Sequence, residues 1–163
     1  MAHPDRVDKI IDQWAAERPD LDTVAMAVFG RIFRLAKVGG DEVEKVYGAF
    51  GIGRPEFDVL ATLRRSGPPY QLSPGALAGS MMLSSGGTTA RLDRLEKAGL
   101  VVRVPSSTDR RSVLVRLTDR GRAIIDDAVG AGLAEQHRLL SHMGPERVRE
   151  LASLLRDALA DRA

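Results

Sequence analysis

Hydrophobic residues in the first third of the chain recur at the spacing of amphipathic helices. The first such segment, residues 5–18, has four apolar residues on one face: Val7, Ile10, Ile11 and Trp14. Pro19 ends it, because the residue before a proline avoids helical backbone angles. A second helical pattern covers residues 21–50, but each glycine of the pair Gly39-Gly40 destabilises a helix interior by about 1 kcal/mol. We therefore expect a bend or a break in the second helix at this pair.

The middle of the chain predicts three further helices from their start and stop residues. Pro55 suits the first turn of a third helix, which ends near the turn residues 66–69. Ser73-Pro74 is typical of an N-cap followed by proline at the first helical position, and it predicts a short fourth helix. Ser84-Ser85 offers a cap for the fifth helix, which ends at Gly99.

Two apolar, β-branched runs follow this fifth helix. They cover residues 100–105 and 112–117, and the polar turn SSTDRR joins them, so the pattern predicts a β-hairpin. Thr118 can cap a sixth helix that extends to about Ser141, and Gly144-Pro145 can begin a seventh. The predicted fold is mainly α with a small β-hairpin, an α+β class in which two short helices precede a hairpin.

The composition favours a single globular domain. The chain has 163 residues, of which 44% are hydrophobic and 28% charged. The absence of cysteine excludes disulfides, zinc–thiolate sites, iron–sulfur clusters and cysteine nucleophiles. No apolar run approaches the roughly 18 residues of a membrane-spanning helix, and the first residues lack the apolar segment of a secretory signal. We therefore expect a cytoplasmic protein with no membrane partner.

Positive charge is concentrated in one segment of the chain. The net charge of all 163 residues is only +2, whereas residues 91–122 hold nine basic and four acidic side chains. Such a patch is what binding to the phosphate backbone requires, although a surface charge run is often only a solvated face.

The order of two short helices and an arginine-tipped hairpin describes a winged helix-turn-helix, whose second helix enters the DNA major groove. Small polar residues at the start of that helix can contact phosphates and base edges, and the hairpin tip can reach an adjacent minor groove. The simpler interpretations are plain capping for Ser84 and an exposed turn for the tip. The expected DNA contacts are Ser84, Ser85, Thr88, Thr89, Arg94, Arg110 and Arg111, with Asp109 holding a wing arginine in place.

The segment LEKAGLVVRVPSSTDRRSVLVRLTDRG, residues 95–121, closely resembles the wing region of the MarR family of bacterial transcriptional regulators. The matching motif residues are Asp109, Arg111, Leu117, Thr118 and Gly121. The resemblance implies one domain over residues 1–163 with a winged helix-turn-helix over 55–118. It also implies that helices within 5–50 and 119–162 build a homodimer, which binds a palindromic operator with half-sites about 10 base pairs apart.

Arg91 stands out on the predicted fifth helix. At helical spacing it projects into the arc of Leu92 and Leu95, whereas Asp93 and Lys97 point away. A buried guanidinium is costly unless an acceptor pairs with it, so a protein acid or an anionic ligand should lie nearby. The alternative is that Arg91 angles outward to a DNA phosphate.

The chain also resembles the urate-responsive branch of the family, whose four ligand-site residues match Trp14, Asp58, Arg91 and Arg103. The resemblance implies that Trp14 stacks on a planar anion that both arginines bind, and that the anion disturbs an Asp58–Arg103 pair. Occupancy would then shift the recognition helix and release a repressor from DNA. Taken singly, Trp14 can be packing, Asp58 a solvated acid and Arg103 a surface charge. The alternative within this branch is a regulator that senses another aromatic or carboxylate metabolite.

Other classes of protein fit the sequence less well. His137 and His142 are five residues apart, which does not suit metal ligation from one helix face, and no catalytic motif is present. We therefore expect neither an enzyme nor a metal or cofactor. A helical interaction module that offers its basic hairpin to an acidic protein is one alternative, and a regulator that senses a different ligand, or none, is another.

Overall fold

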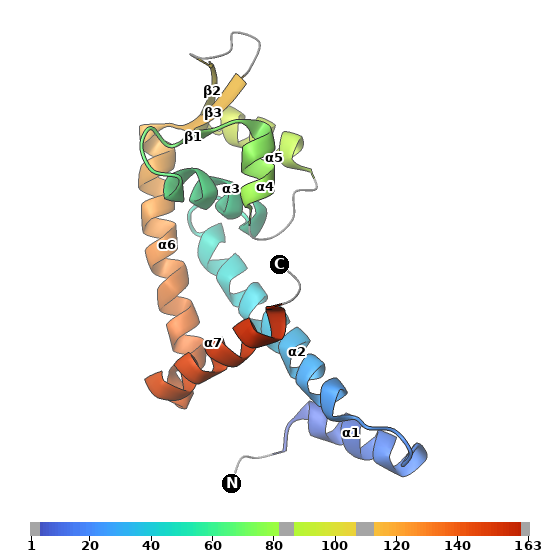
Figure 1. Ribbon diagram of the computed structural model, residues 1–163. Coiled ribbons are helices and arrows are strands. Elements are labelled where there is room, and N and C mark those ends of the chain that lie inside the picture. The colour runs from blue at the N-terminus through green and yellow to red at the C-terminus, as the bar shows by residue number, and fades with distance from the viewer. Residues whose placement is uncertain (1–3, 82–86, 107–112, 161–163) are drawn as a thin grey trace. The chain divides into compact units, whose positions relative to one another are not determined.

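The computed structural model describes residues 4–81, 87–106 and 113–160 (Figure 1). The chain divides into two compact units, Met1–Glu42 and Val43–Ala163. In the described residues no helix is both long enough and apolar enough to cross a membrane.

The first unit contains helix α1, Arg6–Glu17, and most of helix α2, Val24–Gly48. Asp5 caps α1 by accepting from the amides of Val7 and Asp8, at 2.6 and 3.0 Å, and Asp8 accepts from the Asp5 amide in return. This capping box satisfies amides that have no partner inside the helix. The predicted first helix is therefore confirmed.

The predicted break at Gly39-Gly40 is wrong, because α2 continues through both glycines for 25 residues. The reason is the size of the penalty: about 1 kcal/mol per glycine is small beside the cooperativity of a long helix whose turns on both sides are already formed.

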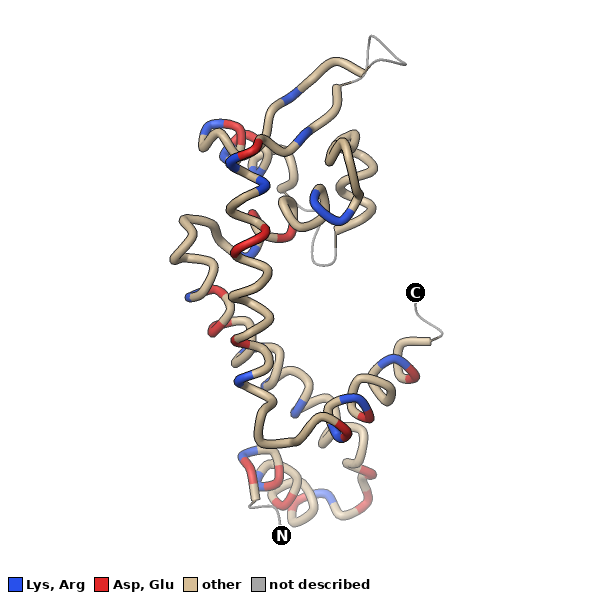
Figure 2. Tube along the Cα trace, turned by 90° about the vertical axis from the view of Figure 1, so that its left-hand side faces the viewer, with Lys and Arg blue, Asp and Glu red and all other residues tan. Residues whose placement is uncertain are grey.

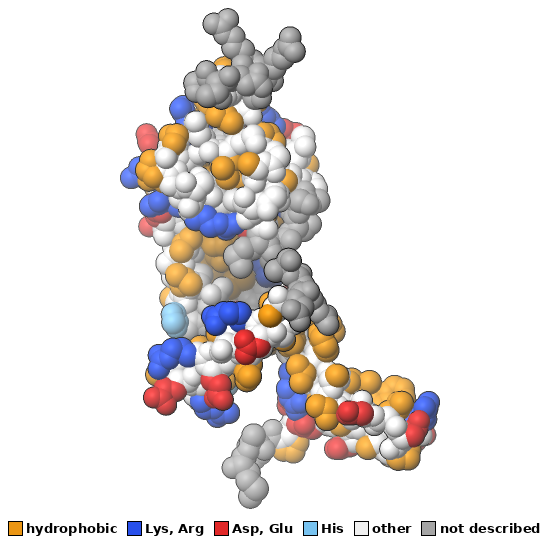
Figure 3. Space-filling view, viewed as in Figure 1, with side chains coloured by type: hydrophobic (Ala, Val, Ile, Leu, Met, Phe, Trp, Pro, Cys, Tyr) orange, Lys and Arg blue, Asp and Glu red, His pale blue; other side chains and the backbone are white. Residues whose placement is uncertain are grey.

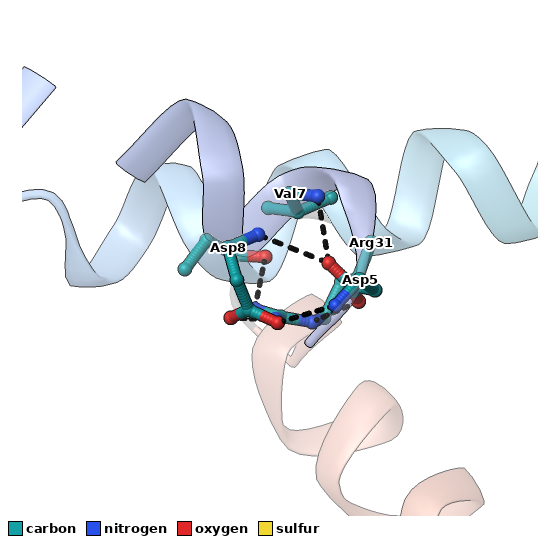
Figure 4. Close-up of polar contacts among 5 residues, drawn as sticks. Asp5, Val7, Asp8 and Arg31 are labelled. Atoms are coloured by element: carbon teal, nitrogen blue, oxygen red, sulfur yellow. Dashed lines mark hydrogen bonds and ion pairs between the residues drawn. The ribbon is translucent and has the colours of Figure 1, made fainter. Parts of the chain in front are cut away.

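Arg31 joins α1 to α2 (Figure 4). Its guanidinium donates to Asp5 Oδ2 at 3.0 Å and to Asp8 Oδ1 at 2.5 Å. Beside this cluster, Val7 is buried and lies close to Gly30, where an added Cβ would be 3.1 Å from Val7 Cγ1. We call Asp5, Asp8 and Arg31 the α1 clamp.

After the last residues of α2, the second unit contains three helices that form the centre of the expected DNA-binding region. They are α3, Arg54–Arg65; α4, Pro74–Ser80; and α5, Thr88–Lys97. Ser73 caps α4 as predicted, since its hydroxyl accepts from the Ala76 amide at 3.2 Å. The start of α5 differs from the prediction. The helix begins at Thr88 after Gly87, which has a φ of 71°, a left-handed conformation that favours glycine.

A three-stranded antiparallel sheet lies beside these helices. Its strands are β1, Gln71–Leu72; β2, Val101–Pro105; and β3, Val113–Leu117, in the order β1-β3-β2. The hairpin of β2 and β3, which we call the wing, confirms the prediction, whereas β1 was not predicted. Its two residues pair with Arg116 and Val115 of β3.

Two helices complete the second unit: α6, Asp119–Leu140, and α7, Pro145–Leu159. The Thr118 hydroxyl accepts from the Gly121 amide at 3.0 Å and donates to the Gly99 carbonyl at 2.8 Å, which fixes the start of α6 against the end of α5. The core of this unit is apolar and draws on α3, α4, α5, β3 and α6, with Leu60, Leu63, Leu77, Leu95, Val115 and Ile125 almost fully buried. The predicted class, mainly α with a small β-hairpin wing, is confirmed.

Candidate nucleic-acid interface

Helix α5 has one buried and one exposed face. Leu92 and Leu95 are buried in the core, whereas Thr89 and Lys97 are exposed. Thr88, the first residue of the helix, is half-buried. Because α5 begins at Thr88, both Thr88 and Thr89 lie in its first turn, where backbone amides and side-chain hydroxyls can bind the phosphates of DNA. The other two residues expected there, Ser84 and Ser85, lie outside the described residues.

The wing carries basic residues on both of its strands (Figure 2), Arg103 on β2 and Arg116 on β3. The expected minor-groove residues of its tip, Asp109, Arg110 and Arg111, lie outside the described residues.

Arg103 connects the wing to α5. Its guanidinium donates to Asp93 Oδ1 at 2.6 Å and to Glu96 Oε2, and its backbone amide donates to Glu96 Oε1 at 3.2 Å. The hydrogen bond that Arg103 donates to Asp93 and the nearby charge of Glu96 raise the pKa of Arg103 above its ordinary value. The expected partner was Asp58, so the sequence-based pairing is corrected: Arg103 bonds to two acids of the recognition helix.

Arg94, an expected DNA contact, is engaged elsewhere. Two of its guanidinium nitrogens donate to Glu56 Oε1 in the first turn of α3, at 2.6 and 3.0 Å. Glu56 is largely buried, with 16% of its side chain exposed, whereas 60% of the Arg94 side chain is exposed. The pair joins α5 to α3, and sequence reasoning missed it because 38 residues separate the partners.

Asp58 and Arg91 lie in the interior-facing parts of their helices. Asp58 is 4% exposed, so it is not a solvated acid on the polar side of α3. Its backbone carbonyl accepts from the Thr62 hydroxyl at 2.7 Å. Arg91 is half-buried on α5 and directly precedes the buried Leu92.

Trp14 belongs to the first unit. It lies on α1 and is 41% exposed, so it is not a residue of that unit's interior. Both His137 and His142 are exposed, and the described residues contain no group of three or more histidine or acidic side chains that could hold a metal.

Comparison with known proteins agrees with this geometry. Residues 50–112 match the model of the MarR family. The chain is 40% identical over 155 residues to the HTH-type transcriptional regulator PecS of Dickeya dadantii, which covers 95% of this chain and 93% of PecS. It is also 29% identical over 117 residues to the regulator MhqR of Bacillus subtilis, covering 71% and 78% of the two chains.

Solved structures show the same fold. A MarR variant from E. coli complexed with operator DNA matches with a TM-score of 0.71 and 26% identity, covering 84% of this chain and 97% of that one. AbsC of Streptomyces coelicolor matches with a TM-score of 0.74 at 21% identity, covering 86% and 95%.

The winged helix-turn-helix and these relatives define a DNA-binding transcriptional regulator. The chain belongs to the MarR family. Its relatives are regulators and not enzymes, which agrees with the expectation drawn from the missing catalytic motifs.

Proposed function

We propose that this protein is a homodimeric repressor that binds a palindromic operator and is released by a small aromatic anion such as urate. It acts in the cytoplasm, on the nucleoid when it is bound to DNA. The winged helix-turn-helix over residues 55–118 reads the operator, and helices within 5–50 and 119–162 form the dimer. All 163 residues work as one regulatory domain.

The observation that carries this proposal is the connection between the wing and α5. The Arg103 guanidinium donates hydrogen bonds to Asp93 and Glu96 of α5, so the wing and α5 are joined before DNA binds. The recognition helix and the hairpin therefore contact DNA as one preformed surface. The exposed Thr89 and Lys97 lie on that helix, and Ser84, Ser85, Arg110 and Arg111 are proposed to complete the contact, with Asp109 orienting a wing arginine. Arg94 contributes by fixing α5 to α3 in addition to any contact with phosphate.

A second copy of the chain is the proposed cover for two apolar surfaces. In the first unit, hydrophobic side chains gather over α1 and α2 (Figure 3), and the exposed fractions of Val24 and Phe33 are 70% and 68%. In the second unit, Leu154 and Leu159 of α7 are similarly exposed. Exposed apolar patches of this kind mark interfaces, and most oligomers of soluble proteins are symmetric homo-oligomers.

Of the four proposed effector residues, Asp58, Arg91 and Arg103 belong to the second unit and Trp14 belongs to the first. A planar anion would stack on the indole ring and accept hydrogen bonds from the guanidinium groups. Because Arg103 holds Asp93 and Glu96, an anion that takes hydrogen bonds from Arg103 competes with both acids. The competition loosens α5 from β2 and so lowers the affinity for DNA. This route replaces the predicted route through an Asp58–Arg103 pair.

The test is a titration of operator DNA followed by fluorescence anisotropy, at fixed salt, with and without urate. Wild type, Arg91→Ala, Arg103→Ala and the control Arg120→Gln are compared. Arg120 is an exposed arginine at the start of α6 whose Nη1 donates to the Ala98 carbonyl, at 3.3 Å. We expect urate to weaken DNA binding by wild type and Arg120→Gln by at least about tenfold, and to act much less on the other two variants.

Each result separates one part of the proposal from another. If urate leaves DNA binding by wild type unchanged, urate is not the effector. If it acts on Arg91→Ala and Arg103→Ala as strongly as on wild type, the effector binds elsewhere. Selective DNA binding in the absence of urate tests the regulator itself and does not depend on either outcome.

A further inference from the structure

A cleft at the base of the wing lies apart from the proposed effector residues. It has a volume of about 400 Å³, within the range of small-molecule sites, and it is lined by residues of β2, β3 and the first turn of α6. Val102 and Arg116 line it and face each other across the two strands. Because side chains alternate along a strand, Arg103 lies on the opposite face of the sheet.

Two arginines in this cleft have no carboxylate partner among the residues that the structure describes. Most arginines with a hydrogen-bonded guanidinium in the described part of the chain are in ion pairs, for example Arg31, Arg64, Arg94 and Arg103. Arg116 and Arg122 line the cleft, are exposed, and form no ion pair with any described residue. Their charges are therefore available to an anion, and a guanidinium binds a carboxylate through paired N–H donors.

Tyr70 provides an aromatic wall that the backbone holds in place. It has a φ of 57°, a left-handed conformation that a residue other than glycine seldom adopts. Its amide donates to the Gly67 carbonyl at 2.7 Å, and its carbonyl accepts from the Leu117 amide at 3.1 Å. The guanidinium carbons of Arg64 and Arg122 lie 5.0 and 5.6 Å from the ring centroid. Strained residues that their surroundings hold in this way concentrate at binding sites.

One acid also lines the cleft. Asp119, in the first turn of α6, contributes to its wall and repels an anion. A ligand with its charge at one end fits this arrangement, since its carboxylate can bind at Arg116 and Arg122 while its apolar part lies against Tyr70.

We propose that the wing-base cleft binds a small aromatic carboxylate at Arg116 and Arg122, independently of the effector site. The cleft contacts β2, β3 and the start of α6, so a bound molecule would link the wing to the helix that follows it.

The test is isothermal titration calorimetry with benzoate, carried out on full-length Arg91→Ala protein so that the proposed effector site is impaired. Arg116→Gln, Arg122→Gln and Asp119→Asn are each combined with this variant, and Arg120→Gln is the control because Arg120 does not line the cleft. Benzamide, which has the same shape and no charge, is the second titrant. Circular dichroism checks that each protein is folded.

The proposal expects saturable binding of one benzoate per chain and weak or no binding of benzamide. Arg116→Gln and Arg122→Gln should each weaken benzoate binding by about tenfold, Arg120→Gln should leave it unchanged, and Asp119→Asn should strengthen it. The proposal is overturned if benzoate does not saturate, if benzamide binds equally well, or if neither glutamine variant changes the affinity.

Discussion

Two glycines of α6 differ sharply in the space around them. A Cβ added to Gly121 would lie 2.0 Å from the Leu100 carbonyl oxygen, a backbone atom that already accepts from the Thr118 amide at 3.1 Å. A Cβ added to Gly130 would meet nothing within 4 Å. The first glycine lets α6 approach the start of the wing, whereas the second only weakens its helix.

This contrast predicts opposite effects of one substitution in one helix. Gly121→Ala should lower the free energy of unfolding by about 3 kcal/mol or more, because the backbone at Leu100 has to move. Gly130→Ala should raise it by about 0.5–1 kcal/mol, because alanine is the better helix former. Urea denaturation at a fixed protein concentration measures both. Equal unfolding free energies for the two variants would contradict the packing described at Gly121.

The sequence predicts single residues well where the cause is local. The Thr118 cap of α6 and the Ser73 cap of α4 follow from the type of residue that stands just before each helix. The partners of Arg103 could not be found in this way. They depend on how β2 packs against α5, and this tertiary packing cannot be inferred from the residues adjacent to Arg103 in the sequence.

Among the elements, α1 is the one whose attachment depends most on charge. The amide hydrogen bonds from Asp8 and Val7, together with the charge of Arg31, hold the pKa of Asp5 below its ordinary value of 3.8. A lowered pKa means that the stabilisation is complete above the ordinary value and is lost as the pH falls through the lowered one. Arg31 keeps its charge throughout, because its bond to Asp8 raises its pKa.

The α1 clamp therefore predicts a pH-dependent attachment of α1. Hydrogen exchange of the α1 amides should be slow at about pH 6 and should become markedly faster, after correction for intrinsic rates, as the pH falls below about 3.8. Arg31→Leu should speed exchange in α1 already at about pH 6. The control Lys37→Leu, which removes an ion pair to Asp41 within α2, should not. Equal protection of α1 in Arg31→Leu and wild type would contradict the role of the clamp.

The predicted order of the helices and the hairpin is correct because caps, glycines and prolines mark most helix ends in this chain. Two of the differences from the prediction have distinct physical causes. At Gly39-Gly40 the cooperativity of a 25-residue helix exceeds the local penalty of the two glycines. Strand β1 has only two residues, too few to show an alternating pattern, and it exists because β3 offers it hydrogen bonds.

At the scale of the whole molecule, the exposed apolar surfaces and the basic segment both bear on the proposed binding of DNA by two copies of the chain. A single chain leaves Val24, Phe33 and Leu154 exposed, and a single winged helix reads only one half-site. In the proposed homodimer a second copy would meet both needs, because twofold symmetry would cover like surfaces with like and present two α5 helices to a palindrome. The net charge of only +2 for each chain means that specificity has to come from the shape and placement of the basic segment.

The most direct test of this account is the binding of the purified protein to DNA from its own upstream region. Anisotropy is measured at several salt concentrations against a scrambled duplex of the same composition, and the mass of the complex is determined by sedimentation. We expect two chains per duplex, an affinity that falls steeply with salt, and a preference of about a thousandfold or more for the upstream DNA. The account would be contradicted if no part of the upstream region bound more tightly than the scrambled duplex. A complex with one chain per duplex would also contradict it.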